Sequence, residues 1–358
     1  MELMSETHRA LGGRFVELAG SRAVADYGDP VTEYRMVRER GGVIDRNYRR
    51  MLQVSGPDRE ALMQAMTTND VVKQAPDSAI VNAICTGHGK VQSLFLSVKL
   101  ADHLLLDMDP VVGDFTHKFL EKYTLIRDAA TCDVSGEWGR AGVYGPLAAE
   151  TVAAALQMPA AGLAEALTAA AGGVLHGPGG ALVVVTGEYG LPGFELFVPA
   201  ADFARRWGDL LAAGEPRRVG PFGFTTLETL RIEAGRPRYG MEVDDSVILL
   251  EAGLTDAVSF EKGCFVGQET LSRVVFRGQL NRRLCGLLVG GAVPESGDEV
   301  RDGDAVVGVV KSVCYSPGRD AVLALAYLKR SHWEPGSAVT IHDAPAQTAD
   351  LPFGAPPG

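Results

Sequence analysis

Cysteine is scarce in this chain and is never closely paired. The five cysteines are Cys85, Cys132, Cys264, Cys285 and Cys314, an odd number with no CxxC spacing. The pattern therefore indicates neither a disulfide framework nor a metal site built from cysteines alone. A reducing, cytoplasmic setting fits this cysteine usage best.

Long apolar runs and an excess of positive charge are also missing. No uncharged apolar stretch is long enough to span a bilayer, and residues 1–26 carry charges throughout, unlike a signal peptide. We therefore expect no membrane association. Lys and Arg number 34 against 45 Asp and Glu, which gives a net charge of −11. Because phosphate neutralisation needs clustered cations, we expect no direct nucleic-acid binding.

One local group of cations stands out in this acidic chain. Arg273, Arg277, Arg282 and Arg283 lie close together in the sequence and could hold an anionic group of a ligand or partner. A charge run of this kind is more often a solvated face.

Length and composition predict a folded protein of two or three domains, with an α+β fold. We expect an N-terminal α+β portion over residues 1–135, completed by residues 225–280, and a middle α+β domain over residues 136–224. Short apolar runs separated by Gly, Pro and Asp turns predict an all-β barrel over residues 281–342. Residues 343–358 are rich in Pro, Ala and Gly and are predicted to be a disordered tail.

The segment around Cys264 has the most unusual sequence in the chain, EKGCFVGQE over residues 261–269. A cysteine between glycines has little side-chain cover, and Lys262 would favour the reactive thiolate. Gln268 adds a directional polar group beside it. The alternative is a buried cysteine in a glycine-bounded turn, because free cysteine is among the most buried residue types.

Residues 262–269, continued by Val275-Phe-Arg-Gly278, resemble the signature of the YgfZ family of folate-binding proteins. That family is related to the T-protein, the aminomethyltransferase, of the glycine cleavage system. The resemblance implies a three-domain, T-protein-like cloverleaf around a central folate site, with a C-terminal all-β barrel. It also implies that an iron–sulfur role depends on the cysteine at position 264.

Two further segments resemble the T-protein family, and the similarity extends over roughly residues 31–341. Thr67-Thr-Asn-Asp-Val71 resembles its TND segment, and Leu230-Arg-Ile-Glu-Ala-Gly235, followed by Tyr239-Gly240, resembles a second hallmark. The resemblance thus implies folate-binding roles for Asn69, Tyr239 and Gln268.

An acidic turn offers a site for the pterin ring of a folate. A pterin presents an N–H and an amine side by side, which one carboxylate can accept in bidentate fashion. Thr186–Glu195 (TGEYGLPGFE) supplies the carboxylate and a flexible turn, and resembles the TGEDGFE segment of T-proteins. We expect Glu195 to be the first candidate and Glu188 the second, with Arg231 as the partner of the folate carboxylates. Taken alone, an acidic residue beside a turn is usually just solvated, and an isolated LRIE arginine usually lies on a helix surface.

One segment departs from the T-protein pattern. T-proteins that move an aminomethyl group carry two aspartates in a GGI-x-DDL segment, whereas Gln92 and Ser93 stand there in this chain. Neither side chain can usefully accept a proton near neutral pH. His88 could substitute as a base, but a histidine between two glycines is more often a turn residue.

These observations leave three functional hypotheses. The leading one is a tetrahydrofolate-binding accessory protein that supports assembly or repair of iron–sulfur proteins, including tRNA-modifying enzymes, with Cys264 as the functional thiol. Its partners would be a reduced folate and iron–sulfur assembly or client proteins. Because the cysteines are scattered, the chain would hold no intrinsic metal, and Cys264 would be one ligand of a transient cluster. The alternatives are a folate-dependent aminomethyl- or methyltransferase and a non-catalytic folate-binding module.

Overall fold

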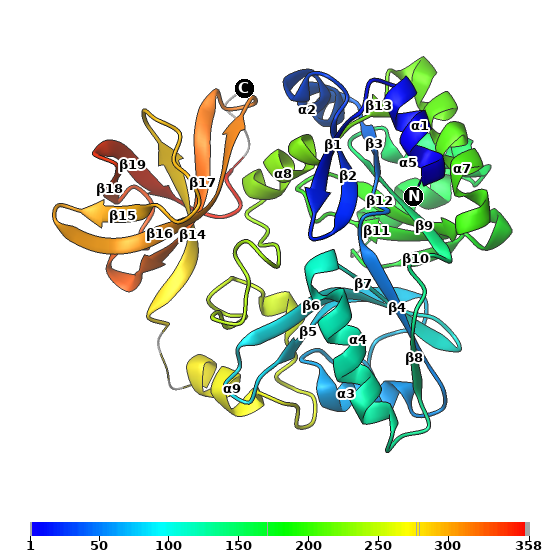
Figure 1. The fold of residues 1–358 in the computed structure, drawn as a ribbon, viewed down its shortest axis with the longest axis horizontal. Coiled ribbons are helices and arrows are strands. Elements are labelled where there is room, and N and C mark those ends of the chain that lie inside the picture. The colour runs from blue at the N-terminus through cyan, green and yellow to red at the C-terminus, as the bar shows by residue number, and fades with distance from the viewer. Residues whose placement is uncertain (1, 170, 277, 279, 355–358) are drawn as a thin grey trace.

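The structure is a computed structural model and describes residues 2–169, 171–276, 278 and 280–354. Three lobes lie around a common centre: two mixed lobes, each built on a sheet, and a barrel (Figure 1). The expected α+β architecture with a C-terminal barrel is confirmed. None of the helices in the described part of the chain is long and apolar enough to cross a membrane.

The first lobe is an antiparallel sheet in the order β5-β6-β7-β4-β8, and helices α3 and α4 share its apolar core. Side chains alternate along β6 between buried and half-buried positions, as expected for a strand in such a sheet. Asp109 caps α4 by accepting from the Val111 N–H at 3.2 Å, and Pro110 occupies the first helical position. The elements of this lobe are β4 Arg50–Ser55, α3 Arg59–Met66, β5 Ser78–Cys85, β6 Val91–Lys99, β7 His103–Met108, α4 Pro110–Thr124 and β8 Ala130–Asp133.

The second lobe is a sheet in the order β10-β11-β12-β9-β3-β13, where only the β3–β13 pair is parallel. Helices α5 and α7 pack on it and share its apolar core. Its sheet strands are β3 Gly42–Asp45, β9 Trp138–Tyr144, β10 Val174–His176, β11 Leu182–Thr186, β12 Gly193–Pro199 and β13 Gly220–Pro221. The remaining elements are α1 Glu2–Ala10, β1 Arg14–Leu18, β2 Ser21–Asp26, α2 Pro30–Glu39, α5 Ala148–Leu156, α6 Ala160–Thr168 and α7 Ala200–Gly214.

The chain passes between the two sheets at the β3–β4 connection. The sequence placed residues 1–135 in one domain, but β3 pairs with β9 and so belongs to the second sheet. The loop between β3 and β4 therefore lies where the two lobes meet.

Helix α8 (Phe224–Glu233) lies in the centre of the molecule and packs against α2, β2 and the barrel strands β16 and β17 (Figure 1). It carries apolar and charged residues on all sides, and most of them are buried. A largely irregular segment follows it and leads to α9 (Gln268–Phe276). Helices in the centre of a protein are buried all round in this way.

The barrel closes in the order β14-β17-β16-β15-β18-β19, with β19 pairing to β14. Its strands are β14 Arg282–Val289, β15 Glu299–Asp302, β16 Ala305–Ser316, β17 Ala321–Lys329, β18 Ala338–Ile341 and β19 Ala344–Ala349. The predicted disordered tail is therefore wrong from Ala344 to Ala349, where the chain forms the closing strand. Phe353 follows it and is buried against β14, and residues 355–358 lie outside the described part.

Candidate functional site

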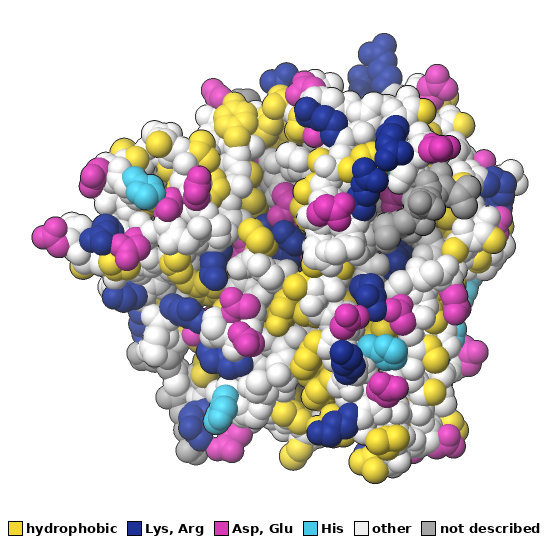
Figure 2. Space-filling view, viewed as in Figure 1, with side chains coloured by type: hydrophobic (Ala, Val, Ile, Leu, Met, Phe, Trp, Pro, Cys, Tyr) yellow, Lys and Arg dark blue, Asp and Glu magenta, His cyan; other side chains and the backbone are white. Residues whose placement is uncertain are grey.

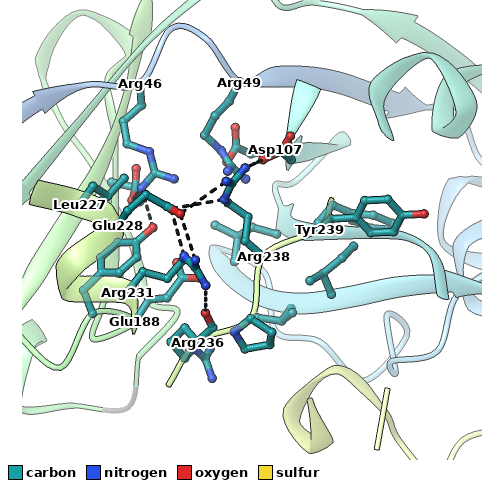
Figure 3. Close-up of a pocket in the computed structure, with 18 of the residues that line it drawn as sticks. Arg46, Arg49, Asp107, Glu188, Leu227, Glu228, Arg231, Arg236, Arg238 and Tyr239 are labelled. Carbon is teal, nitrogen blue, oxygen red and sulfur yellow. Dashed lines mark hydrogen bonds and ion pairs between the residues drawn. The ribbon is translucent and has the colours of Figure 1, made fainter. Parts of the chain in front are cut away.

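A cavity of about 100 Å³ lies where the two sheet lobes meet α8 and the segment after it (Figure 3). Its wall carries as many arginines as acids, together with aromatic and aliphatic side chains. The charged wall residues are Arg46, Arg49, Asp107, Asp109, Glu188, Glu195, Glu228, Arg231, Arg236 and Arg238. The other wall residues are Tyr48, Val81, Leu94, Phe95, Leu96, Tyr189, Phe224, Leu227, Pro237, Tyr239 and Leu254.

Glu195, the first predicted ligand residue, projects from β12 and is only 6% exposed. Its Oε1 accepts from Arg46 Nη1 at 2.6 Å and from the Tyr144 hydroxyl. Arg46 Nη1 also donates to the hydroxyls of Tyr144 at 2.8 Å and Tyr189 at 3.0 Å. Burial raises the pKa of the Glu195 carboxyl, and Arg46 and Tyr144 oppose this rise. Two bonds occupy the lone pairs of Oε1, while Oε2 accepts no hydrogen bond from any described residue and is left to a ligand.

Two glycines make room for the Tyr144 ring that holds Glu195. A Cβ at Gly193 would lie 2.4 Å from Tyr144 Cδ1, and a Cβ at Gly142 would lie 2.5 Å from the Tyr144 hydroxyl. Gly193 pairs directly with Tyr144 in the sheet, and Gly142 pairs with Glu195. The glycine before Phe194-Glu195 in the sequence therefore serves the packing of a tyrosine rather than the mobility of a turn.

Glu188, the second predicted ligand residue, lies in the turn between β11 and β12. Its carboxylate forms no hydrogen bond or ion pair with the described residues. It lines the first cavity and also a second one of about 570 Å³, which adjoins the first along Val81, Leu96, Glu188, Glu195 and Arg236. Glu188 is therefore free to meet a ligand in either cavity.

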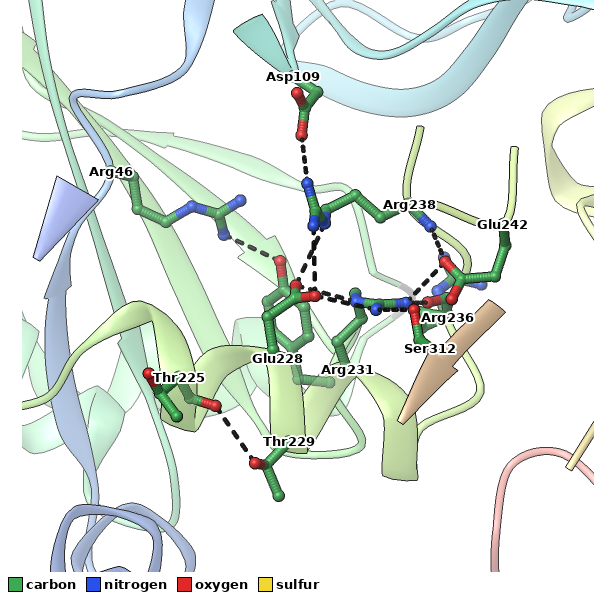
Figure 4. Close-up of polar contacts among 11 residues, drawn as sticks. Arg46, Asp109, Thr225, Glu228, Thr229, Arg231, Arg236, Arg238, Glu242 and Ser312 are labelled. Carbon is green, nitrogen blue, oxygen red and sulfur yellow. Dashed lines mark hydrogen bonds and ion pairs between the residues drawn. The ribbon is translucent and has the colours of Figure 1, made fainter. Parts of the chain in front are cut away.

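Arg231 reaches the cavity wall but has no free donor there (Figure 4). Its five N–H groups donate to both carboxylate oxygens of Glu228, to Glu242 at 2.9 Å, to the Arg236 carbonyl at 2.8 Å and to Ser312 Oγ at 3.0 Å. The guanidinium is 4% exposed and Glu242 is fully buried. An arginine with every N–H engaged cannot also grip a folate carboxylate, so the geometry gives Arg231 a structural role.

Sequence reasoning missed Arg46, Arg49 and Arg238, which also line the cavity. Arg49, which like Arg46 lies in the β3–β4 loop, donates from Nε to Asp107 at 2.6 Å. Arg238 donates to Asp109 at 3.3 Å and to Glu228 at 3.4 Å. Figure 3 shows Arg46 and Arg49 pointing toward the same space as Arg238. The dense positive run Asp45-Arg-Asn-Tyr-Arg-Arg50 between two short strands was the signal available in the sequence.

Tyr239 lines the cavity, but three other predicted site residues, Asn69, Lys262 and Gln268, do not. The Asn69 amide donates to the carbonyls of Val81 and Asp256, both at 2.8 Å, so it ties loops together. Burial raises the pKa of Tyr239 to about 12, which keeps its hydroxyl protonated at neutral pH.

Lys262 acts on the backbone of the TND segment rather than on Cys264. Its amine is buried and donates at 2.7 Å to the carbonyls of Thr67 and Asn69. Burial lowers the pKa of this amine to about 8.

Cys264 itself is exposed and lines neither cavity. Gln268 begins α9, also away from both cavities. Nearby, Gly267 has φ of +91°, and a Cβ there would lie 2.6 Å from the Thr86 carbonyl oxygen. The EKGCFVGQE segment therefore packs against the β5–β6 turn. No group of three or more His, Cys, Asp or Glu side chains in the described part of the chain is arranged to hold a metal ion.

Neither Gln92 nor Ser93 lines either cavity. The Ser93 hydroxyl is fully buried and shares a 2.7 Å hydrogen bond with Thr116 of α4. The next residues of the strand, Leu94, Phe95 and Leu96, do line the cavity. The carboxylates nearest to that wall come from the adjacent strand β7 and its end, at Asp107 and Asp109.

The predicted basic patch is largely neutralised within the chain. Arg273 pairs with Glu269 at 2.7 Å, Arg282 pairs with Glu251 at 3.3 Å, and Arg283 stacks on Trp333. Arg277 lies outside the described residues. Cationic and anionic side chains are interspersed over the visible face of the molecule (Figure 2).

Fold and site together define a protein of mixed α/β lobes and a barrel, with a charged cavity between the lobes. The GCVT N-terminal domain family matches residues 4–262, and the glycine cleavage T-protein C-terminal barrel domain matches residues 282–353. The chain therefore belongs to the glycine cleavage T-protein family, and the T-protein-like fold is confirmed.

Curated relatives match nearly the whole chain. An aminomethyltransferase of Symbiobacterium thermophilum is 32% identical over 348 residues, covering 94% of this chain and 91% of the relative. An aminomethyltransferase of Rubrobacter xylanophilus is 32% identical over 353 residues, covering 97% and 92%. The structure of glycine cleavage system aminomethyltransferase T from Bartonella henselae shares the fold, with a TM-score of 0.89 at 21% identity over 99% of this chain and 97% of that one.

These comparisons overturn the leading hypothesis from the sequence. An accessory factor for iron–sulfur proteins is not what the full-length relatives are named for; they are named aminomethyltransferases. The resemblance that is confirmed is to the T-protein family as a whole, not to the YgfZ family in particular. The position of Cys264 outside both cavities agrees with this correction.

Proposed function

We propose that this protein is a folate-dependent one-carbon transferase of the T-protein type, which moves an aminomethyl or methyl group to or from tetrahydrofolate in the central cavity. The observation that carries the proposal is the state of the Glu195 carboxylate at the cavity wall. Arg46 and Tyr144 donate hydrogen bonds to its Oε1, and its Oε2 remains available to a ligand. The names of the full-length relatives support the same reaction class.

The residues of the cavity fit a reduced folate. The N–H and amine of a pterin are donors, and Glu195 Oε2, with both lone pairs unused, is the acceptor open to them. Tyr189, Phe224 and Tyr239 offer aromatic surface to a flat ring. Arg236 is the better candidate for the carboxylate tail than Arg231, because it lines both cavities and, within the described part of the chain, forms an ion pair only with Asp256, at 3.2 Å.

Tetrahydrofolate, when bound, supplies the nitrogens that carry the one-carbon unit. The chain itself must bind the ring, exclude water and manage a proton. Since Gln92 and Ser93 do not serve the last task, we assign it to Asp109, which faces the cavity and holds Arg238 only at 3.3 Å. Its other oxygen caps α4 by accepting from the Val111 N–H at 3.2 Å, and a carboxylate whose contacts are all long is freer to exchange a proton than one in a tight pair.

Calorimetry with tetrahydrofolate and its methyl and methylene derivatives tests the proposal. We expect Glu195→Gln to weaken binding by about tenfold to a hundredfold, because a hydrogen bond to a charged group contributes about 1.5–3 kcal/mol. Glu165→Gln, on an exposed face of α6, is the matched control and should bind as the wild type does.

Two outcomes would contradict the proposal. The first is no heat from the wild type with any folate. The second is folate binding without transfer from any aminomethyl or methyl donor, which would leave a non-catalytic folate-binding module.

A further inference from the structure

The carboxylate that the proposed function depends on is held by residues distant in the sequence. Arg46 reaches Glu195 from the β3–β4 loop, 149 positions earlier in the chain, and Tyr144 reaches it from the end of β9. Both contacts fall on the same oxygen, Oε1. The arrangement fixes the rotation of the carboxylate and leaves the second oxygen toward the cavity.

We propose that Arg46 and Tyr144 are positioning residues that keep Glu195 ionised and turned toward the cavity, so that the site selects rings with adjacent N–H donors. The inference rests on the proposed function, because Glu195 is the ligand-binding carboxylate in it. Arg46 and Tyr144 act through Glu195 and need not touch the ligand.

The hydrogen bonds from Arg46 and Tyr144 matter because Glu195 is buried. A buried carboxylate without a partner becomes neutral, and a neutral carboxyl group offers a donor where the ligand needs an acceptor. Arg46 is itself 4% exposed, and Glu195 is its only carboxylate partner among the described residues. The ion pair with Arg46 therefore favours the charged form of Glu195 against the effect of burial.

The Arg46 guanidinium is held in place from several sides. Its backbone N–H donates to the Arg140 carbonyl at 2.9 Å, and its guanidinium lies 5.8 Å from the centre of the Tyr189 ring. Asp45, the preceding residue, accepts from His8 at 2.8 Å and from the Asn47 N–H at 2.8 Å. A loop anchored in this way delivers the cation to a fixed position, as a preorganised site requires.

Several titratable groups face Glu195 from the elements around it. Arg46 and Arg49 come from the β3–β4 loop, Tyr144 from β9, Tyr189 from the β11–β12 turn and Asp107 from β7. The two arginines favour the carboxylate and Asp107 disfavours it. Removing Arg46 takes away the largest favourable charge, so the Glu195 pKa must rise.

The sharpest test is the titration of Glu195 in the absence of any ligand. Isotope-labelled glutamate allows the carboxyl carbon to be followed by NMR, and Glu195→Gln identifies its signal. We expect Arg46→Gln to raise the midpoint by at least about one pH unit, and Tyr144→Phe to raise it by less. Arg205→Gln, which removes an exposed arginine paired with Asp202, should leave it unchanged. An unchanged midpoint in Arg46→Gln would overturn the inference.

Folate affinity across about pH 6 to 9 gives the second readout. Because binding requires ionised Glu195, affinity falls as the pH drops below the Glu195 pKa, by about tenfold per unit. Arg46→Gln should move this fall to higher pH and recover affinity at the alkaline end. An equal loss at every pH would indicate damage to the fold and would overturn the positioning role.

The two readouts separate this inference from the proposed function. A wild type that binds no folate defeats the proposed function, while the NMR titration still decides the roles of Arg46 and Tyr144. If Arg46→Gln does not fold, Tyr144→Phe carries the test, because it removes one hydroxyl and keeps the ring between Gly142 and Gly193. A wild-type midpoint in Tyr144→Phe would then count against the inference.

Discussion

Replacing Arg231 by methionine distinguishes a structural arginine from one that binds a ligand. Methionine keeps an apolar stem of similar length and removes all five N–H donors. Glu228 would keep Arg238, at 3.3 Å, as an ion-pair partner. Glu242 is fully buried and, among the described residues, would keep only the Arg238 backbone N–H as a donor, at 3.0 Å.

The expected loss of stability follows from the Glu242 charge, which would be left without its ion-pair partner. Removing one partner of a buried ion pair costs about 3–5 kcal/mol, since the other charge is left uncompensated. Loss of the hydrogen bond to Ser312 also loosens the contact between α8 and the barrel. We therefore expect Arg231→Met to lower the free energy of unfolding by about 3–5 kcal/mol, a large fraction of the stability of a typical domain.

Denaturant unfolding, followed by circular dichroism, measures this loss. The double variant Arg231→Met/Glu242→Gln should recover part of it, because a buried amide costs less than a buried unpaired carboxylate. A loss of stability below about 1 kcal/mol, together with folate affinity weakened more than about tenfold, would refute the structural role. That result would return Arg231 to the ligand-binding role that its sequence motif suggests.

Two further substitutions test the segment around Cys264. Cys264→Ala should change the free energy of unfolding by no more than about 0.5 kcal/mol and leave folate affinity unchanged, because the thiol is exposed and outside both cavities; a tenfold weaker calorimetric affinity would contradict this. Gly267→Ala should cost about 1–3 kcal/mol in denaturant unfolding, since φ is +91° and a Cβ meets the Thr86 carbonyl. Gly263→Ala is its control, because a Cβ there meets nothing within 4 Å, and equal losses in the two variants would refute the packing argument.

The sequence predicted the elements whose patterns are local. Short apolar runs separated by turn residues predicted most strands of the barrel, because a run between two turns is a local signal. Strand β19 was missed because Ala344–Ala349 has small, polar and proline residues with weak strand propensity. It becomes a strand through its pairing with β14 and β18, which local sequence does not encode.

For the site, sequence motifs indicated residues but not their partners. Residues two apart on a helix face different sides, so Arg231 and Glu233 do not pair, and Glu233 instead binds Tyr34 and Arg38. That Arg231 would meet Glu242 and Ser312 was not predictable, since these residues come from a loop and from the barrel. The same holds for Arg46, whose partner Glu195 lies on a strand 149 positions further along the chain.

The geometry of β6 bears on how the absence of the aspartate pair at Gln92 and Ser93 is interpreted. Because side chains alternate along a strand, Ser93 points toward α4, where its hydroxyl bonds Thr116, while Gln92 shares a face with Leu94 and Leu96. An acid at position 93 would therefore be directed at the helix and not at a bound ligand. The cavity still contains carboxylates, at Asp107 and Asp109 on the neighbouring strand and its end. The absence of an acid at Gln92 and Ser93 is therefore compatible with the transferase reaction that we propose, in which Asp109 handles the proton.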